Sequence, residues 1–378
     1  MVSRRMILKT GVAAIVVLGV GGGIWAGTRN PDRALAPWRQ AGTGYGDARL
    51  DALAYAVLSP NPHNRQPWLV QLIGDDALDL YCDLDRRLPE TDPFDRQITV
   101  GLGCFSELFR MAAAEAGYKA TIVPFPDGEP SPRLDSRRVA RIRLVKEIVK
   151  KDQLFDAVFD RRSVKEPFDI SKPIASTLLA DLVSGERHGG TVDMGVITGL
   201  RELSWNAHEV ETLTPRTMQE SVDLMRFGKT EIEANPDGID FGGPAFELMN
   251  VTGLMTRENV GDPASTSFKQ GMKIYDEMLH SAMGYVWITS AGNTRTQQLI
   301  AGRDWVRLNL RATQLGLAVH PLSQALQEYS EMDELYAALH KSLGIEAPSR
   351  LQMFARIGYG PRIEPSPRWP MKTRLIKA

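Results

Sequence analysis

The chain has 378 residues, of which 43% are hydrophobic and 24% charged, a balance that excludes wholesale disorder and predicts a globular protein with a sizeable core. It holds 45 Lys and Arg against 46 Asp and Glu. Because residues 1–30 contain four of the bases and no acid, the remainder carries a net charge of −5, which argues against nucleic-acid binding. Two cysteines, Cys82 and Cys104, exclude a disulfide framework and a cysteine-rich metal site, and leave a single disulfide open.

The chain begins with a short basic segment followed by an uncharged stretch from Thr10 to Thr28, the order of an export signal. The pair Arg4-Arg5 resembles a twin-arginine signal, which implies the twin-arginine export machinery as a partner and a periplasmic location, or attachment to the outer face of the inner membrane. An ordinary membrane anchor is the alternative, although residues 11–26 would span only about 24 Å as a helix, against a hydrocarbon core of roughly 30 Å. Cleavage stays open, since Pro37 follows the small-residue motif Ala34-Leu35-Ala36. Twin-arginine export moves folded proteins, often loaded with a cofactor, so a tightly held organic cofactor is expected.

The first part of the body alternates helices and strands. Apolar spacing predicts a helix over 49–58, which must end at the prolines of Ser59-Pro60-Asn61-Pro62. A strand is expected at 68–73, with a hairpin partner at 78–82. A helix at about 103–116, a strand at 120–124 and a Pro/Gly-rich loop at 124–133 follow.

Residues 133–151 are basic, but Val139–Val145 alternates between apolar residues and arginines, which predicts the solvated face of a strand and no nucleic-acid role. An apolar helical run is expected at 154–159. Further on, residues 226–244 contain two Gly/Pro-rich turns and read as a long excursion, either a lid or a plain surface loop.

The later chain repeats a pattern of the earlier one. Gly103, Ala113 and Gly117 have the same spacing as Gly302, Ala312 and Gly316, and both runs are helical and lead to an apolar segment and a proline. A single match of this kind suggests an internal repeat without proving one.

Two short motifs carry the chemistry. The first, Ser59 to Trp68, is a proline-fixed loop in which Asn64 and Gln66 offer carboxamides that can both donate to and accept from the edge of a uracil-like ring. The second, Arg161-Arg162-Ser163, offers two guanidiniums and a hydroxyl, which suit a phosphate monoester. Together they indicate a phosphorylated heterocycle as ligand.

The motif Ser-Pro-x-x-His-Asn-x-Gln-Pro-Trp at 59–68 and the Arg-Arg-Ser at 161–163 resemble the two halves of the flavin site in the nitroreductase superfamily. The ending Ile357-Gly358-Tyr359 … Arg368-Trp369-Pro370 also resembles that superfamily. In ordinary members the Arg-Arg-Ser comes first. The reversed order, the leader and the run Asp83 to Arg96 resemble the tandem Acg-like branch, in which two nitroreductase-like halves are fused. This resemblance implies an α+β fold, a nitroreductase-like α-β-α sandwich of two fused half-repeats that form an intramolecular pseudo-dimer in a monomeric protein.

The resemblance divides the chain into a leader at 1–30, a first half at 31–150, and a second half at 151–378 with the excursion around 226–244. Residues 31–48 lack an Arg-Arg-Ser, and residues 184–190 of the second half lack the Asn loop. One complete FMN site per chain is therefore expected, between the halves. By resemblance, Arg161, Ser163 and Arg368 hold the phosphate, and Asn64 faces the ring. The full set of expected cofactor-binding residues is Ser59, His63, Asn64, Gln66, Arg161, Arg162, Ser163 and Arg368. Gln66 has an equally plausible role in holding backbone, and Trp68 is expected to be core.

No metal site is expected, because the six histidines show no ligand spacing. No catalytic side chain is expected either, since hydride transfer is the flavin's own chemistry. The resemblance implies an FMN-dependent oxidoreductase that reduces a small acceptor such as a nitroaromatic or quinone. NAD(P)H is essentially absent outside the cytoplasm, so an exported enzyme needs another reductant or reduction before export. The alternative is an FMN-binding storage or sequestration protein with little turnover.

Overall fold

The computed structural model describes residues 29–377, so the leader, except for its last two residues, lies outside the described part. The first half contains the following elements in chain order: α3 Ala36–Gln40, α4 Ala48–Ala56, the short 3-10 helix η1 Pro62–Asn64, β1 Trp68–Ile73, β2 Ala77–Cys82, η2 Leu84–Arg86, α5 Arg96–Glu115, β3 Tyr118–Pro124 and β4 Ala140–Lys146. The hairpin and the strands lie where the sequence predicts them.

The second half repeats this order around a large insertion. It contains η3 Gln153–Ala157, α6 Ser176–Leu182, β5 His188–Thr191, β8 Gly284–Ser290, α13 Arg295–Gln314, β9 Ala318–Pro321, η4 Gln324–Leu326, η5 Ser330–Met332, α14 Asp333–Ser342, β10 Arg350–Gly358 and η6 Met371–Arg374. Each half forms one four-stranded antiparallel sheet, in the order β1-β2-β4-β3 and β5-β8-β10-β9. The same order of equivalent strands confirms the α+β class and the predicted duplication.

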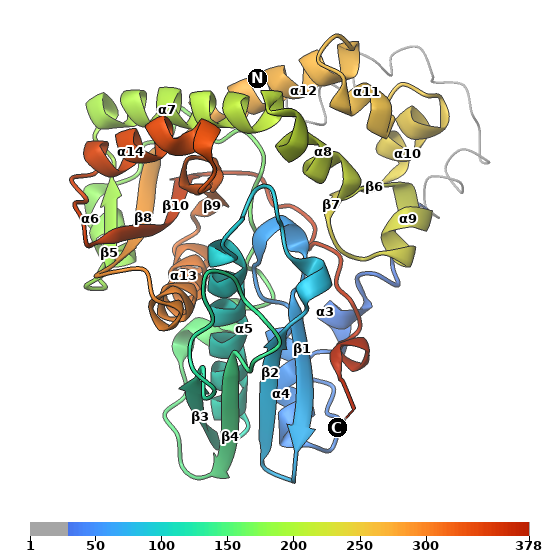
Figure 1. Cartoon of the computed structure of the whole chain (residues 1–378), viewed down its shortest axis with the longest axis vertical. Coiled ribbons are helices and arrows are strands. Elements are labelled where there is room, and N and C mark those ends of the chain that lie inside the picture. Colours follow the sequence, from blue (N-terminus) through green and yellow to red (C-terminus); the bar gives the residue numbers. More distant parts are fainter. Residues whose placement is uncertain (1–28, 378) are drawn as a thin grey trace.

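Helices α5 and α13 run side by side at the centre of the molecule, each packed on the sheet of its own half (Figure 1). Gly103 and Gly302 lie at the crossing. A Cβ on Gly103 would come 2.2 Å from the carbonyl oxygen of Leu299, and one on Gly302 would come 2.0 Å from that of Val100. The repeated glycines therefore let the two backbones touch, and the two halves share one continuous hydrophobic core.

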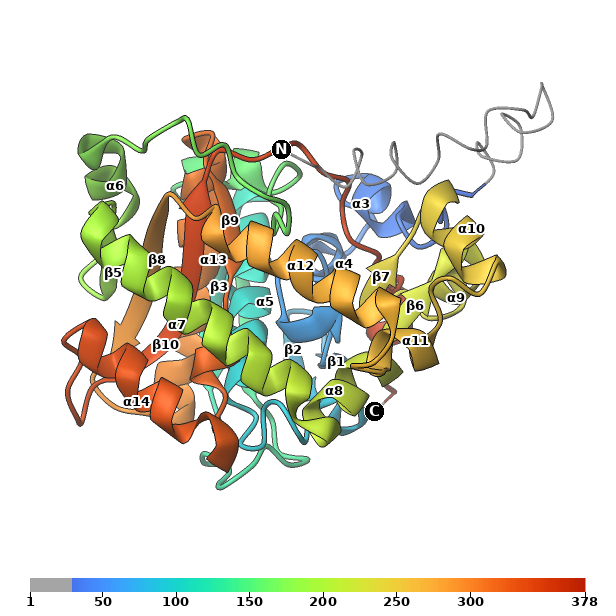
Figure 2. The same cartoon turned by 90° about the horizontal axis from the view of Figure 1, so that it is seen from above.

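In the second half a large insertion lies between β5 and β8, where the first half has only a tight turn between β1 and β2. It contains α7 Met194–Leu213, α8 Pro215–Asp223, β6 Met225–Phe227, α9 Gly228–Ala234, β7 Ile239–Phe241, α10 Pro244–Val251, α11 Arg257–Gly261 and α12 Thr266–His280. Figure 2 shows its α9, α10 and α11 gathered at one end of the molecule. Residues 226–244 are therefore not a plain loop, because the parallel pair β6–β7 and a small apolar cluster around Phe227 organise them.

The C-terminal tail crosses from the second half back to the first. The N–H of Arg368 donates to the carbonyl of Ala34 at 2.8 Å, and the N–H of Ile376 donates to that of Val70 at 2.9 Å, so that Leu375 forms a parallel bridge beside β1. This crossing carries Arg368 to the Asn loop of the first half.

Two predicted elements differ from the structure. Helix α5 begins at Arg96, not near residue 103, because the buried carboxylate of Asp92 accepts hydrogen bonds from the N–H groups of Gln97 and Ile98 and stabilises a polar-looking first turn. The apolar run at 154–159 forms a 3-10 helix over Gln153–Ala157, not an α-helix.

The basic run forms an ordinary strand, as predicted. In β4, Ala140, Ile142 and Leu144 are buried, while Arg143 is exposed and Arg141 pairs with Asp79 at 2.6 Å. No helix among residues 29–377 is both long enough and apolar enough to span a membrane.

Candidate functional site

The Asn loop is a strained turn between α4 and β1. His63, Asn64 and Gln66 have φ of 46°, 51° and 53°, a left-handed conformation that costs free energy for any residue except glycine. Asn61 holds the turn in place: its Oδ1 accepts the N–H of Gln66 at 2.6 Å, and its Nδ2 donates to the carbonyl of Ser59 at 3.1 Å. Asn61 lies inside the predicted motif but was not among the predicted site residues. The sequence feature that could have identified Asn61 is its place between two prolines, because an Asn side chain in a turn often hydrogen-bonds the nearby backbone.

Ser59 and Gln66 are both fully buried and have partners within the protein. The Ser59 hydroxyl donates to the carbonyl of Ala56 at 2.7 Å and so closes the end of α4. Gln66 Nε2 donates to the carbonyl of Pro236 at 2.7 Å, and its Oε1 accepts the N–H of Trp369 at 2.8 Å. Gln66 thus joins the Asn loop to the insertion and to the tail, which favours its backbone-holding role. Trp68 packs in the core against Phe105, as predicted.

The structure brings the two sequence motifs together through Arg368. Its Nη1 donates to Asn64 Oδ1 at 2.6 Å. Its Nη2 donates at 3.2 Å to the carbonyl of Leu58, the same oxygen that accepts a hydrogen bond from Arg161 at 3.2 Å. Residues more than 90 positions apart thus form one cluster, which combines the first half's loop with the second half's arginines and tail.

This cluster carries buried positive charge without a matching carboxylate. Arg161 is 4% exposed and Arg368 is 2% exposed, and no salt bridge joins either to an acid within residues 29–377. Burial and the charge of Arg162 lower the pKa of Arg161 to about 10. Burial and the charges of Arg161 and Arg162 lower the pKa of Arg368 to about 9. The Nε of Arg368 is buried and has no hydrogen-bond partner in the described chain.

An isolated buried charge is costly unless it is paired, so the cluster has the electrostatics of an anion site. The free Nε of Arg368 and the planar guanidinium of Arg161 suit the oxygens of a phosphate monoester. The residues present therefore fit the phosphate of FMN.

Trp38, in α3, completes the cluster and was missed by the motif search. The guanidiniums of Arg162 and Arg368 lie over its ring, at 5.0 and 5.4 Å from the centroid. Arg162 also donates to the carbonyl of Ile363 at 3.2 Å, so it holds the tail, while Ser163 beside it is only partly buried. Trp38 lies in a short helix without a recognisable pattern, so the sequence offered no signal for it.

His63 is held neutral. Burial and the positive charges of Lys165 and Arg65 lower its pKa to about 4, so the ring is uncharged at neutral pH and can both donate and accept a hydrogen bond. Within the described residues, no group of three or more His, Cys, Asp or Glu is arranged to hold a metal ion.

Besides the hydrogen bond from Gln66 to Pro236, a carboxylate of the insertion fastens it to the Asn loop. Asp237 forms ion pairs with Arg65 at 3.5 Å, with Arg226 at 3.0 Å and with Arg86, and it accepts a hydrogen bond from Trp369 Nε1 at 3.3 Å. Burial opposes ionisation of Asp237, but the three arginines outweigh it and hold its pKa below the ordinary value. We call Asp237 with Arg65, Arg86 and Arg226 the latch. Sequence reasoning missed it, because its members come from three distant segments.

Known proteins with similar sequences carry provisional nitroreductase names. A Mycobacterium tuberculosis protein provisionally named NAD(P)H nitroreductase acg is 26% identical over 85% of this chain and 92% of its own length. A second protein provisionally named NAD(P)H nitroreductase, from the same organism, is 23% identical over 84% of this chain and 87% of its own length. No family model matches the chain. These relatives support the predicted resemblance to the nitroreductase superfamily and to its Acg-like branch.

Two solved structures show a weaker likeness. A protein of Anabaena variabilis provisionally named a nitroreductase has a TM-score of 0.42 at 11% identity, over 83% of this chain and 88% of its own. The FMN-dependent nitroreductase NfnB of Mycobacterium smegmatis, in complex with NADPH, has a TM-score of 0.32 at 17% identity, over 55% of this chain and 88% of its own. Such low scores add nothing to the fold that the sheet topology defines.

Proposed function

We propose that the protein is an FMN-dependent oxidoreductase of nitroreductase type that reduces a small acceptor such as a nitroaromatic or a quinone. The observation that carries the proposal is the cluster of unpaired arginines joined directly to the Asn loop by the Arg368–Asn64 hydrogen bond of 2.6 Å. The names of the two Mycobacterium tuberculosis relatives support the same activity.

The division of labour follows from the chemistry of each group. Arg161 and Arg368 would hold the phosphate, and the ring of Trp38 would support Arg368 and its neighbour Arg162. Asn64 donates through Nδ2 to the carbonyl of Pro367 at 3.0 Å and accepts from Arg368, which fixes the orientation of its carboxamide. A carboxamide has two N–H groups and two lone pairs, so one of each remains for the edge of the ring. Bound FMN would supply the electron or hydride transfer, and the protein would supply orientation and electrostatics.

The visible spectrum of the purified protein is the first test. A flavin spectrum, followed by bleaching with NADPH or another reductant and recovery of the colour with a nitroaromatic, is the expected result. A colourless protein that does not take up added FMN would contradict the proposal.

Storage of flavin with little turnover is the second candidate. The contacts that favour it are those between the insertion and the Asn loop, namely Gln66 to Pro236 at 2.7 Å and the N–H of Gly238 to the carbonyl of Asn64 at 3.4 Å. An insertion that closes the site would slow both exchange of flavin and access of acceptor. A yellow protein that is reduced but then reacts with no acceptor would support this candidate.

Export by the twin-arginine route, to the periplasm or to the outer face of the inner membrane, is part of the proposal. It rests on Arg4-Arg5 and the uncharged stretch after them, which lie outside the described residues. The double change Arg4→Lys and Arg5→Lys should keep the protein in the cytoplasm with normal flavin content. Unchanged periplasmic yield in cell fractions would rule out this route.

A further inference from the structure

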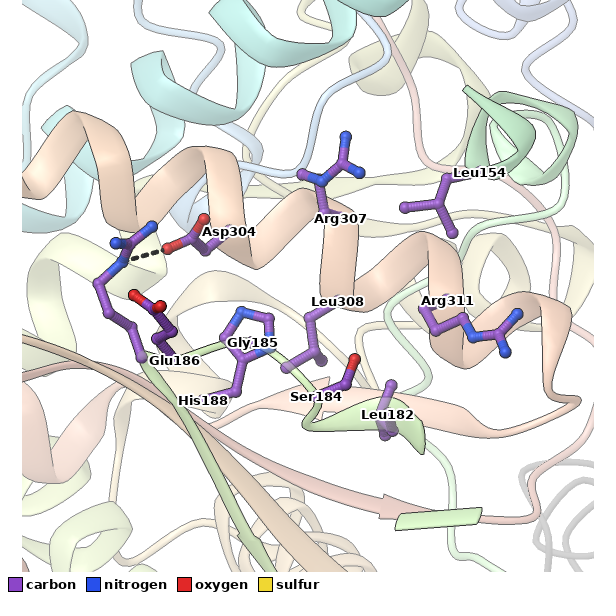
Figure 3. Close-up of a pocket in the computed structure, with 11 residues that line it drawn as sticks. Leu154, Leu182, Ser184, Gly185, Glu186, His188, Asp304, Arg307, Leu308 and Arg311 are labelled. Carbon is purple, nitrogen blue, oxygen red and sulfur yellow. Dashed lines mark hydrogen bonds and ion pairs between the residues drawn. The ribbon is translucent and has the colours of Figure 1, made fainter. Parts of the chain in front are cut away.

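The second half contains a cavity of about 360 Å³ between α13 and the turn 184–188 that precedes β5 (Figure 3). Three leucines, Leu154, Leu182 and Leu308, form its apolar part. Figure 3 shows the imidazole of His188 facing the side of α13 that carries Leu308, with Arg311 farther along the same helix. The other lining residues are polar, charged or glycine. A pocket of this size that combines apolar side chains with polar groups is within the range of small-molecule sites.

The duplication explains how the cavity arose. His188 is the first residue of β5, as Trp68 is of β1. Asp304 follows Gly302 of α13 at the distance at which Phe105 follows Gly103 of α5. In the first half Trp68 and Phe105 are fully buried, with ring centroids 5.0 Å apart, and they fill this position. In the second half the smaller polar residues His188 and Asp304 stand at these positions, and the space remains open.

By the same correspondence, Leu308 in the cavity wall is the counterpart of Phe109, which is fully buried in the first half. A tryptophan and two phenylalanines of the first half thus correspond to smaller side chains in the second half. The space that the larger rings would fill is open at this surface and lies next to polar side chains, which suits a ligand.

Two polar groups around the cavity are available to a ligand. His188 Nδ1 is buried and has no hydrogen-bond partner in the described chain, and the imidazole lies so close over Gly185 that a Cβ there would come 2.8 Å from Nδ1. Burial lowers the pKa of His188, so the ring is neutral. At the rim, Arg311 donates to Asp181 at 3.1 and 2.5 Å and to Gln314 at 3.2 Å. Both members of the Arg311–Asp181 pair are more than a third exposed, so solvent screens the pair and Asp181 can be exchanged for an incoming anion.

The other two arginines that line the cavity pair with acids less exposed than Asp181. Arg187 is held by Asp304 at 2.6 Å, and Arg307 bridges Glu107 and Asp152 at 2.9 and 2.5 Å. Arg311 is therefore the group that can best accept a new partner.

We propose that this cavity is a second ligand site, separate from the arginine cluster, which binds a small aromatic carboxylate with its ring among the three leucines and its carboxylate on Arg311. His188 Nδ1 hydrogen-bonds a polar substituent of the ring or an ordered water beside it. The site occupies the position where the first half has solid core, so it does not compete with the proposed flavin.

The test uses the full protein as purified, with ¹³C-labelled histidine, and titration with benzoate. Benzyl alcohol keeps the ring without the charge, and acetate keeps the charge without the ring. We expect benzoate to shift the His188 imidazole signal saturably while leaving any flavin spectrum unchanged. Benzyl alcohol and acetate should each bind at least about tenfold more weakly, since a charge-assisted contact or the ring's apolar contact is lost. The signal is assigned by its loss in His188→Gln.

Two variants locate the binding. Leu308→Phe places in the cavity the ring that the first half has at Phe109, and should abolish the benzoate shift. Arg311→Gln, on the exposed rim, should weaken benzoate about tenfold and leave benzyl alcohol unchanged. The proposal is overturned if benzoate leaves His188 unmoved, if it changes only the flavin spectrum, or if both variants bind benzoate like the natural chain. Because the His188 signal is independent of flavin, a colourless protein would contradict the proposed oxidoreductase without affecting this result.

Discussion

At the scale of single residues, the candidate site is defined by unpaired charge. Arg161 and Arg368 are more deeply buried than most arginines of the chain and face each other across one shared carbonyl oxygen, that of Leu58. Most other arginines of the described part are paired with acids, as Arg141 is with Asp79. Arg356 is also fully buried without a salt bridge in the described residues, but it stands alone among neutral acceptors. Two such arginines on one carbonyl oxygen, with the Nε of Arg368 left without a partner in the described residues, support the proposal of an anionic ligand.

Arg161→Ala tests whether the arginine motif binds the phosphate of FMN while the Asn loop binds its ring. Loss of a charge-assisted contact to the phosphate should cost about 1.5–3 kcal/mol, roughly 10- to 150-fold in FMN affinity. Riboflavin lacks the phosphate and should bind almost as before. Asn64→Ala is the matched control, because it should weaken both ligands alike through the ring. Fluorescence titration of the apo-protein measures all four affinities. Equal loss of riboflavin and FMN in Arg161→Ala would mean that Arg161 does not bind the phosphate.

At the scale of elements, the pair α5–α13 holds the two halves together. Their closest approach is at Gly103 and Gly302, where even one methyl group has no room. The helices can therefore be neither shifted nor separated without loss of the shared core on which both sheets rest.

Gly103→Ala should destabilise the protein by about 3 kcal/mol or more, at the upper end of the cost of overpacking, because its methyl group would meet backbone and not a movable side chain. Gly199→Ala in α7 is the control. Nothing lies within 4 Å of the added Cβ there, so the change should stabilise the helix by roughly 0.5–1 kcal/mol. Denaturant unfolding at constant flavin saturation measures both. A Gly103→Ala protein as stable as the control would refute the close crossing.

The packing of α7 on α12 predicts a pH dependence. His208 stacks on Tyr275 with ring centroids 4.0 Å apart, and burial lowers its pKa to about 4. Because the folded pKa lies below the unfolded value of about 6.5, the unfolded state takes up the proton first, and stability falls as pH drops from about 6.5 towards 4.

His208→Phe keeps an aromatic ring at this position but removes the group that takes up a proton. Between pH 7.5 and pH 5, the variant should lose about 2 kcal/mol less stability than the natural chain, by urea unfolding at the two pH values. His280 provides the opposite case. Acidic neighbours raise its pKa despite partial burial, so its contribution is lost as pH rises, and His280→Gln should not reproduce the effect. Parallel pH profiles for His208→Phe and the natural chain would contradict the buried neutral state.

At the scale of the whole molecule, two topologically equivalent halves carry unequal sites. The first half supplies the Asn loop, the second supplies the arginines and the tail, and the equivalent position around 184–188 has no such motif. We therefore expect one flavin site per chain.

Flavin released by denaturation and quantified per polypeptide should therefore give a ratio near one. The Arg161→Ala protein, prepared in parallel, should retain less. A ratio of two would show that flavin also binds where both motifs are missing. It would overturn the argument that the first half lacks the Arg-Arg-Ser, the second half lacks the Asn loop, and only one complete site remains.

The latch predicts how the insertion controls access. Asp237→Asn removes the one carboxylate shared by three arginines, so the insertion should detach from the Asn loop and FMN should be released at least about tenfold faster. Asp223→Asn, on an exposed position of the same insertion, should release FMN at the natural rate. The recovery of flavin fluorescence after dilution follows the release. Equal rates in the two variants would mean that the latch does not close the site.

The sequence by itself determined the local structure of the first half and the two motifs. Two short apolar runs on either side of a turn predicted the hairpin of β1 and β2, the prolines predicted the turn that holds Asn64, and the repeated glycines predicted the duplication that the matching sheets confirm. These features could be predicted because each depends on residues close together in the chain, where spacing alone dictates the backbone.

Only the tertiary structure decided which charges are paired. Nothing local distinguishes Arg86, which binds the latch, from Arg161, which has no acid, or predicts that Trp38 stacks under two arginines from the other half. The ordered insertion and the cavity beside His188 likewise could not be predicted from residues close together in the chain. Electrostatic and packing free energies depend on which segments lie next to each other in space. The crossing of α5 and α13 and the return of the C-terminal tail to the first half bring these segments together. The spacing of residues in the sequence predicts neither.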